Sequence, residues 1–224
     1  MRSEAIERSL PSQPRKTHMA KLYFFYSAMN AGKTTSLLQS AYNYKQRGMR
    51  PVLYLPQRDD RAGRGVIRSR LGLEAEATPF GERFDLFEDV RSRVEADGVD
   101  CVFVDEAQFL TPTQVLQLTM ICDQLKIPAL TYGLRTDFRG EPFEGSKYLL
   151  AWAEELVELK TVCRSGRKAT MSARMSADGE RVFEGDQVQI GYNYEPLSRH
   201  LFDLPKSSPI PYPKSPNPKS PSER

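Results

Sequence analysis

Apolar and polar positions follow two alternating patterns along most of this chain. Short, mainly apolar runs, which favour buried strands, occur at residues 22–26, 51–55, 100–105, 127–132 and 156–162. Between them, apolar residues recur every three or four positions, which predicts amphipathic helices over 33–47, 84–96, 112–126 and 143–153. Strands that alternate with helices in this way form a parallel sheet covered on both faces, so we expect an α/β fold.

Segments that carry reactive side chains each follow one of these strands. They are residues 27–34, 59–61, 105–109 and 134–138. Because the ligands of parallel α/β sheets bind at the carboxyl ends of the strands, the four segments are expected to form one site at that edge of the sheet.

The pattern changes after residue 162. Residues 163–203 hold short β-like runs between polar turns such as Ala177-Asp-Gly179 and Glu184-Gly-Asp186. This texture indicates a small β-rich module with a long excursion. We therefore expect the α/β domain to cover residues 19–162 and the module to cover residues 163–203.

Both ends of the chain lack an apolar period. Residues 1–18 mix charged residues with Pro11 and Pro14, and two readings stay open: a flexible native arm, or a natural start at Met19. Residues 204–224 repeat Pro, Ser and Lys and cannot bury enough apolar surface to offset the entropy of ordering. We expect a disordered tail there, with a PxxP-type docking peptide as the alternative.

Composition and charge exclude several classes of function. The net charge is only +3 over 224 residues, without a clear basic cluster, so no nucleic-acid partner is expected. No apolar run approaches the roughly 18 residues of a membrane span, and no signal peptide is visible. Three scattered cysteines are too few for a secreted disulfide framework. A reducing, cytoplasmic setting is expected, without a membrane partner.

The clearest chemical signal lies between the first strand and the first helix. Its spacing matches the phosphate-binding pattern G-x-x-x-x-G-K-[ST], except that Ser27 replaces the first glycine, which is tolerable if its φ is negative. Backbone N–H groups and the helix N-terminus would bind phosphate, Lys33 would neutralise its charge, and the Thr34 hydroxyl would ligate Mg²⁺. ATP and Mg²⁺ are thus the expected cofactors. The predicted binding residues are Ser27, Ala28, Met29, Asn30, Ala31, Gly32, Lys33 and Thr34.

Two acids end the third strand. Asp105 fits the acid that holds Mg²⁺ in phosphate-loop enzymes, and Glu106 could abstract a proton. That proton would come from water in an ATPase or from a substrate hydroxyl in a small-molecule kinase, while a simple loop cap is the bland alternative. Asp105, Glu106, Ala107 and Gln108 complete the predicted nucleotide-binding set.

Apolar side chains follow two of the strands at the same edge. Phe109, Leu134 and Phe138 could wall a planar base, although ordinary core packing explains them equally well. The loop Asp59-Asp-Arg61 adds charge on the ligand side.

Together these motifs resemble the cytosolic (type II) thymidine kinase family in its bacterial form, over roughly residues 19–202. The stretches that carry the resemblance are Leu22–Thr35, Asp59–Arg61, Val104–Phe109 and Tyr132–Gly140. The resemblance implies a P-loop NTPase (RecA-like) sheet and transfer of the γ-phosphoryl of ATP to the 5′-hydroxyl of thymidine. Deoxyuridine would be a further acceptor, and dTMP would enter nucleotide salvage. Bacterial members commonly carry serine at the position of Ser27.

The resemblance also implies particular roles. Glu106 would be the general base, with Lys33 and Arg61 as further catalytic residues and Asp105 as the acid beside the metal. The residues that would wall the thymine are Met29, Phe109, Leu134, Phe138 and Tyr194. Family members are usually homotetramers inhibited by dTTP, and both properties are expected here.

One part of the family pattern is missing. The family's C-terminal module is a zinc ribbon with a lasso loop over the nucleoside, which the stretch Gly191–Tyr194 resembles. In this chain the ligand positions hold Cys163, Ser165, Ser198 and Leu201, with His200 one position away. A structural zinc needs four nitrogen or sulfur ligands, so we expect a degenerate ribbon without zinc.

Two other functions stay open. A P-loop ATPase would use Glu106 on water, and a catalytically weakened nucleotide-binding regulator would bind without turnover. The loop 59–61 and the segment 134–138 favour the kinase, because a generic ATPase does not need them.

Overall fold

The structure is a computed structural model that describes residues 20–59, 63, 65–188 and 193–203. The predicted arm, the predicted tail, Arg61 and the residue pair Gly191-Tyr192 lie outside the described residues. The predictions made for them stay predictions.

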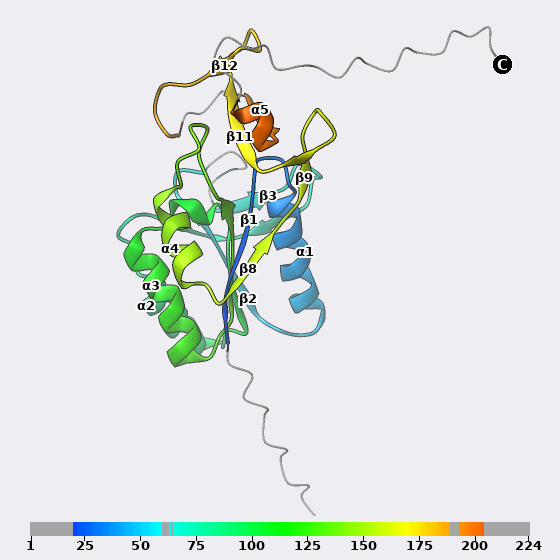
Figure 1. Ribbon diagram of the computed structural model, residues 1–224. Helices are drawn as coiled ribbons and strands as arrows, with labels where there is room; N and C mark the ends of the chain where they lie inside the picture. The colour runs from blue at the N-terminus through cyan, green and yellow to red at the C-terminus, as the bar shows by residue number, and fades with distance from the viewer. Residues whose placement is uncertain (1–19, 60–62, 64, 189–192, 204–224) are drawn as a thin grey trace, which may run out of the picture.

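A six-stranded parallel sheet forms the centre of the molecule (Figure 1). Its order is β5 (Thr78–Phe80), β2 (Pro51–Pro56), β6 (Cys101–Val104), β7 (Ala129–Leu134), β1 (Leu22–Ser27) and β8 (Glu155–Glu158). The apolar runs of the sequence supply five of these strands, because strands buried on both faces of a parallel sheet need apolar side chains throughout. The predicted α/β class is confirmed.

Helices cover both faces of the sheet. Helix α1 (Lys33–Gln46) lies on one face, and α2 (Leu86–Ala96), α3 (Pro112–Met120) and α4 (Glu144–Trp152) lie on the other (Figure 1). Each face has its own apolar core: Leu37 and Tyr132 lie on the α1 side, and Phe24, Val104 and Leu118 on the opposite side. None of the helices in the described part of the chain is long and apolar enough to cross a membrane.

The helix expected over 112–126 is not one α-helix. A capping box of Thr111 and Gln114 starts α3, but the α-helix ends at Met120 and continues as a π-helical segment, η2 (Ile121–Leu125). Both Ile121 and Cys122 are buried in this wider turn. Lys126 then ends the segment in the left-handed region, with φ of 59°.

Residues 66–80 form three strands that the periodicity does not reveal. β3 (Val66–Arg68) and β4 (Glu74–Glu76) make an antiparallel hairpin, and β5 joins the edge of the main sheet. Strands of three residues are too short to show a period, and β4 carries two glutamates. The strand expected over 156–162 is divided into β8 and β9 (Thr161–Val162).

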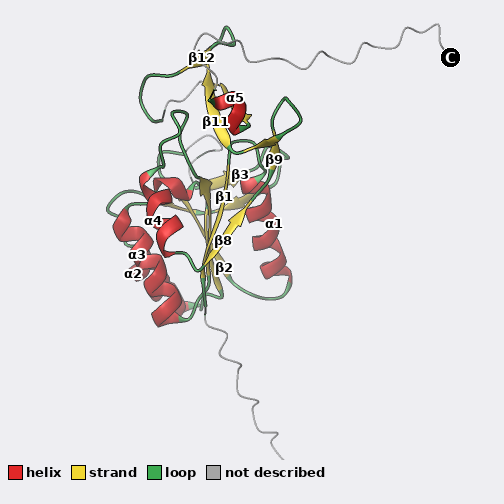
Figure 2. Cartoon of the chain, viewed as in Figure 1, coloured by secondary structure: helices red, strands yellow, loops and turns green. Residues whose placement is uncertain are grey.

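The β-rich module lies beyond the carboxyl ends of the sheet strands, and Figure 2 shows that it consists mainly of strands and loops. β9 pairs with β10 (Lys168–Ala169), and a second sheet has the order β12 (Arg181–Val182), β11 (Met171–Met175), β13 (Asn193–Leu197). The short helix α5 (Arg199–Phe202) packs on it. The module has its own apolar cluster, so it does not depend only on the main core.

Candidate active site

The phosphate-loop motif forms the turn between β1 and α1. Asn30 and Gly32 take left-handed conformations, with φ of 62° and 73°. Ser27 is the last residue of β1 and is not among the described non-glycine residues with positive φ, which are Asn30, Glu106 and Lys126. A serine therefore fits at this position without backbone strain, as the sequence required.

Ser27 also makes a contact that a glycine could not. The Lys33 ammonium donates hydrogen bonds to the Ser27 hydroxyl, at 3.1 Å, and to the Ala28 carbonyl, at 3.2 Å. The hydroxyl itself donates to the Ala28 carbonyl at 2.7 Å. These contacts hold the lysine over the loop, where phosphate oxygens would be stronger partners for it.

The structure brings Thr34 and Asp105 together. Thr34 Oγ1 donates to Asp105 Oδ2 at 3.1 Å, and the other carboxylate oxygen accepts from the Glu106 backbone N–H at 3.0 Å. Asp105 is almost completely buried, and this burial, followed by the charge of Glu106, raises the pKa of its carboxyl group well above the usual range. A bound cation would relieve this cost, so the pair fits the predicted Mg²⁺ ligands.

Glu106 follows in a strained backbone conformation. Its φ of 46° and ψ of 41° are left-handed, and it begins the short 3₁₀ helix η1 (Ala107–Phe109). Such strain in a bulky residue persists only where the surroundings impose it, and it is concentrated at functional sites. Both acids line one cavity.

Gln108 fixes the Glu106 carboxylate. Gln108 Nε2 donates to Glu106 Oε2 at 2.6 Å, and Gln108 Oε1 accepts from the Leu134 backbone N–H at 3.0 Å. Gly133 allows this packing, because a Cβ there would lie 3.0 Å from both the backbone nitrogen and Oε1 of Gln108. The sequence predicted Gln108 as a nucleotide ligand, and the structure directs its side chain toward Glu106 and the end of β7.

These groups face a cavity of about 640 Å³. Its walls include residues 29–35 of the loop and α1, Asp59, Asp105 and Glu106, as well as residues 68–71 of the β3–β4 hairpin. The sequence analysis missed the hairpin wall, which places Arg70 at the cavity. An arginine in a charged segment without a period gives no signal of such a position. Ala107, another predicted nucleotide ligand, is fully buried in the core.

Of the residues predicted to wall the base, Met29 lines this cavity. Leu134 and Phe138 are buried nearby at the end of β7, and Phe109 packs edge-on against Phe143. Tyr194 lies on β13 of the module. The base-binding role of these residues stays a prediction.

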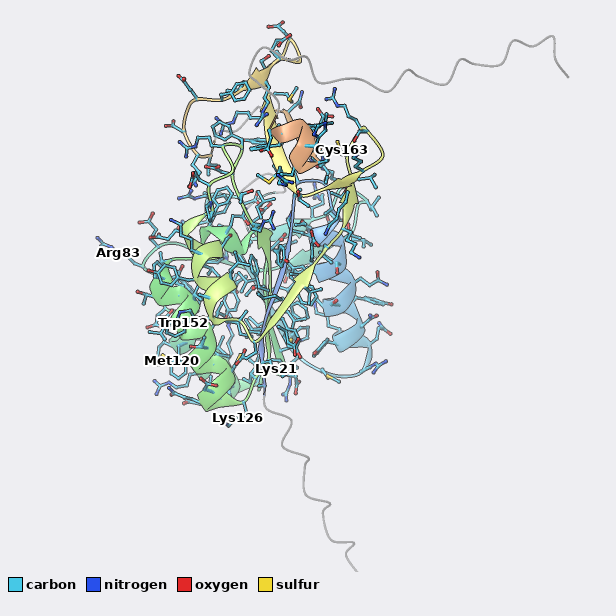
Figure 3. All side chains as sticks on the ribbon, viewed as in Figure 1. Lys21, Arg83, Met120, Lys126, Trp152 and Cys163 are labelled. Atoms are coloured by element: carbon cyan, nitrogen blue, oxygen red, sulfur yellow. The ribbon has the colours of Figure 1, made fainter. Side chains whose placement is uncertain are left out.

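The four positions that the family gives to zinc ligands do meet in space. Cys163 is buried beside α5 (Figure 3), and its thiol has hydrogen-bond partners in Ser165 and Ser198. Burial raises the pKa of the Cys163 thiol, but these hydrogen bonds outweigh burial and the pKa lies below its usual value. Leu201 packs in the same apolar cluster.

This set does not fit a structural zinc. It offers one thiol, two hydroxyl groups and a leucine, whereas a closed zinc site needs four nitrogen or sulfur ligands. The Ser198 hydroxyl instead caps α5 by accepting from the Leu201 backbone N–H at 3.5 Å. Across the described residues, no group of three or more His, Cys, Asp or Glu side chains could hold a metal ion.

The parallel sheet, the phosphate loop after β1 and the acid pair after β6 define an α/β phosphate-loop protein of the kinase or ATPase class. The sequence matches the thymidine kinase family over residues 20–202. The chain belongs to the thymidine kinase family, as the resemblance of its motifs indicated.

Similar proteins come from several bacteria. A thymidine kinase of Xanthomonas campestris pv. campestris (strain 8004) is 57% identical over 187 residues, which cover 82% of this chain and 90% of that protein. One of Colwellia psychrerythraea is 54% identical, covering 82% of this chain and 97% of that protein. One of Salmonella paratyphi A is 57% identical, covering 78% and 85%.

Proposed function

We propose that this chain transfers the γ-phosphoryl group of ATP to the 5′-hydroxyl of thymidine, giving dTMP for nucleotide salvage. Membership of the thymidine kinase family makes the chain a phosphotransferase with thymidine and ATP as its substrates. The observation that carries the finer proposal is the strained Glu106, held by Gln108 on the wall of the cavity that Lys33, Thr34 and Asp105 also line.

The phosphate end of the cavity binds and orients the triphosphate. The loop amides and Lys33 hold its oxygens, and Thr34 and Asp105 would hold Mg²⁺, which neutralises charge on the transferred group. Asp59 and Arg61 belong to the proposed charged loop beside them. Phosphoryl transfer depends mainly on such positioning and charge neutralisation, so few other groups are required.

Glu106 is the proposed general base. Its carboxylate takes the proton of the 5′-hydroxyl while the phosphoryl group is transferred, and Gln108 keeps the carboxylate directed toward the cavity. The proposed walls of the base are Met29, Phe109, Leu134, Phe138 and Tyr194, and deoxyuridine would fit the same walls.

The proposal also gives this protein three further properties that are usual in the family. They are a homotetrameric state, inhibition by dTTP and a cytoplasmic location. No nucleic-acid or membrane partner belongs to the proposal. No structural zinc is proposed, because the residues at the four ligand positions do not fit one.

One coupled assay tests this function. ADP formation is measured with ATP and Mg²⁺ in three reactions, containing thymidine, deoxyuridine or no acceptor. We expect turnover with thymidine and deoxyuridine and almost none without an acceptor. Acceptor-independent hydrolysis would favour an ATPase, and calorimetric binding of thymidine or dTTP without turnover would favour a regulator.

A further inference from the structure

A fully buried arginine links the module to the α/β domain. Arg174 lies on β11, which extends from the module toward the top of the main sheet (Figure 1), and its side chain has no exposed surface. Its guanidinium carbon stacks over the Phe138 ring, 3.7 Å from the ring centroid. Phe138 follows β7 and is itself buried, so the contact spans the two parts of the molecule.

The same guanidinium holds two stretches of the module. Arg174 Nε donates to the Tyr194 hydroxyl at 3.1 Å, and the guanidinium carbon lies 5.5 Å from the centroid of the Tyr194 ring. Arg174 Nη2 donates to the carbonyls of Asp186, at 2.6 Å, and Gln187, at 3.3 Å. A single side chain thus contacts β13, the segment at 186–187 and the loop after β7.

The loop after β7 provides a fixed surface for this contact. The buried Asp137 carboxylate pairs with the Arg139 guanidinium at 3.0 Å and accepts from the backbone N–H groups of Arg139 and Glu141. Gln187 Nε2 donates to the same carboxylate at 3.2 Å, which is a second tie between the loop and the module. Both ties converge on neighbouring residues, Asp137 and Phe138.

Burying a guanidinium is costly unless its donors are paired, and the task of Arg174 is to make these pairs with Tyr194 and two backbone carbonyls. The task here needs an arginine in particular. Its planar fork can stack on Phe138 and donate to Tyr194 and to two carbonyls at once, whereas a lysine ammonium is a point charge on a flexible stem.

We propose that Arg174 is a positioning residue for the nucleoside, which sets the placement of Phe138 and Tyr194 relative to each other. This inference rests on the proposed function, in which those two residues wall the base. The described contacts of Arg174 are with Phe138, Tyr194 and the carbonyls at 186–187, so its proposed action is on the nucleoside end of the site. The phosphate loop meets the same strand through Ser172, whose hydroxyl accepts from the Met29 backbone N–H at 3.0 Å.

The test compares the KM for thymidine with the KM for ATP, because the first reports on the nucleoside end of the site and the second on the phosphate end. In Arg174→Met, and in Arg174→Lys as the milder change, we expect KM for thymidine to rise by about 10-fold or more, since hydrogen bonds to charged groups are lost. KM for ATP should stay within about twofold, because the substitution leaves in place the side chains of the phosphate loop and the Ser172 hydroxyl that accepts from the Met29 backbone N–H. Thymidine binding by calorimetry should weaken in parallel.

Arg181→Met is the matched control. Arg181 also stacks on aromatic rings, those of Phe202 at 4.1 Å and Phe183 at 4.5 Å, and donates to the Phe202 carbonyl at 2.5 Å. These contacts stay inside the module. Loss of this arginine should therefore lower the melting temperature without a selective change in KM for thymidine.

Each outcome decides a separate claim. If the parent protein neither phosphorylates nor binds thymidine, the proposed function and the role of Arg174 both fall. If the parent is active and the Arg174 variants keep its KM for thymidine, only the role of Arg174 is overturned. Equal changes in both KM values, or the same selective change in Arg181→Met, would reduce Arg174 to a structural residue.

Discussion

The phosphate loop keeps the charged residues of the family pattern, whereas the β-rich module lacks most of the residues that bind zinc in that pattern. At the phosphate end the charged groups Lys33, Asp105 and Glu106 are all present, although Asp105 is buried and Glu106 is strained. In the module, three of the four zinc-ligand positions hold Ser165, Ser198 and Leu201 instead, and the fold persists around an apolar cluster.

The difference shows which requirements are chemical and which are only geometric. A reaction needs a given atom at a given place, so packing cannot replace a carboxylate or an ammonium. A structural metal supplies only folding free energy, which burial of apolar surface can also supply. The requirement at Ser27 is also geometric, because this position of the loop needs a particular backbone conformation, which serine can adopt as well as glycine.

The largest effect is expected from Glu106→Gln. It removes the proposed base while keeping the shape of the side chain, so kcat for thymidine should fall by about 10²–10⁴-fold. ATP binding, followed by calorimetry, should change little. Gln108→Leu keeps the proposed base but removes the hydrogen bond that holds its carboxylate, together with the bond from the Leu134 backbone N–H, so a smaller loss, of about 10-fold, is expected from it.

Glu144→Gln serves as the control, because this exposed glutamate lies in the first turn of α4, outside the cavity. It should keep full activity. Full activity in Glu106→Gln would remove the general base from the mechanism and would leave the strained conformation of Glu106 without a catalytic explanation.

The second-largest effect is expected at Asp105, where one substitution should change both the activity and the stability of the protein. Asp105→Asn should lower activity by about 10²-fold, because a proposed metal ligand loses its charge. Its metal-free stability should nevertheless rise at neutral pH. The pKa of Asp105 is raised in the folded protein, so the folded state keeps a proton that the unfolded state has already lost. The parent therefore loses stability as pH rises from the ordinary carboxyl pKa through the raised one.

Thermal melting in metal-free buffer at several pH values measures this effect. The difference in melting temperature between Asp105→Asn and the parent should widen as pH increases, by roughly 2–4 °C for each kcal/mol. Mg²⁺ should stabilise the parent and not the variant. Asp123→Asn, at an exposed aspartate, should show neither behaviour. A constant difference across pH would mean that the pKa of Asp105 is not raised in the folded protein.

The sequence predicts the two regions unequally well. Five of the six strands of the main sheet and the positions of Thr34 and Asp105 follow from local patterns, because buried strands and the phosphate loop have strong local signatures. The β3–β4 wall and the stacking of Arg174 on Phe138 do not. The strands of the hairpin are too short to show a period. The stacking contact joins two separate parts of the chain, and an arginine in a short β-like run is normally a surface residue.

The third effect tests whether packing holds the module. Leu201 is buried against Cys163, Met175 and Leu197, so Leu201→Ala should destabilise the protein by about 2–5 kcal/mol. Leu116→Ala removes the same atoms from a leucine that is 44% exposed, and it should cost much less. Melting temperatures measure both. Equal losses would argue that the cluster contributes no more than a surface contact.

The smallest effect is expected from metal removal. If the cluster around Cys163 replaces zinc, treatment with a strong chelator should leave the melting temperature unchanged, and the KM for thymidine should be unchanged once the chelator is removed and Mg²⁺ is restored. A structural zinc would instead be part of the folding free energy, and its loss would unfold the module. Metal analysis of protein purified without chelator gives the second measurement, with no stoichiometric zinc expected. About one zinc per chain would contradict the replacement, since it would require ligands beyond the four positions that Cys163, Ser165, Ser198 and Leu201 occupy.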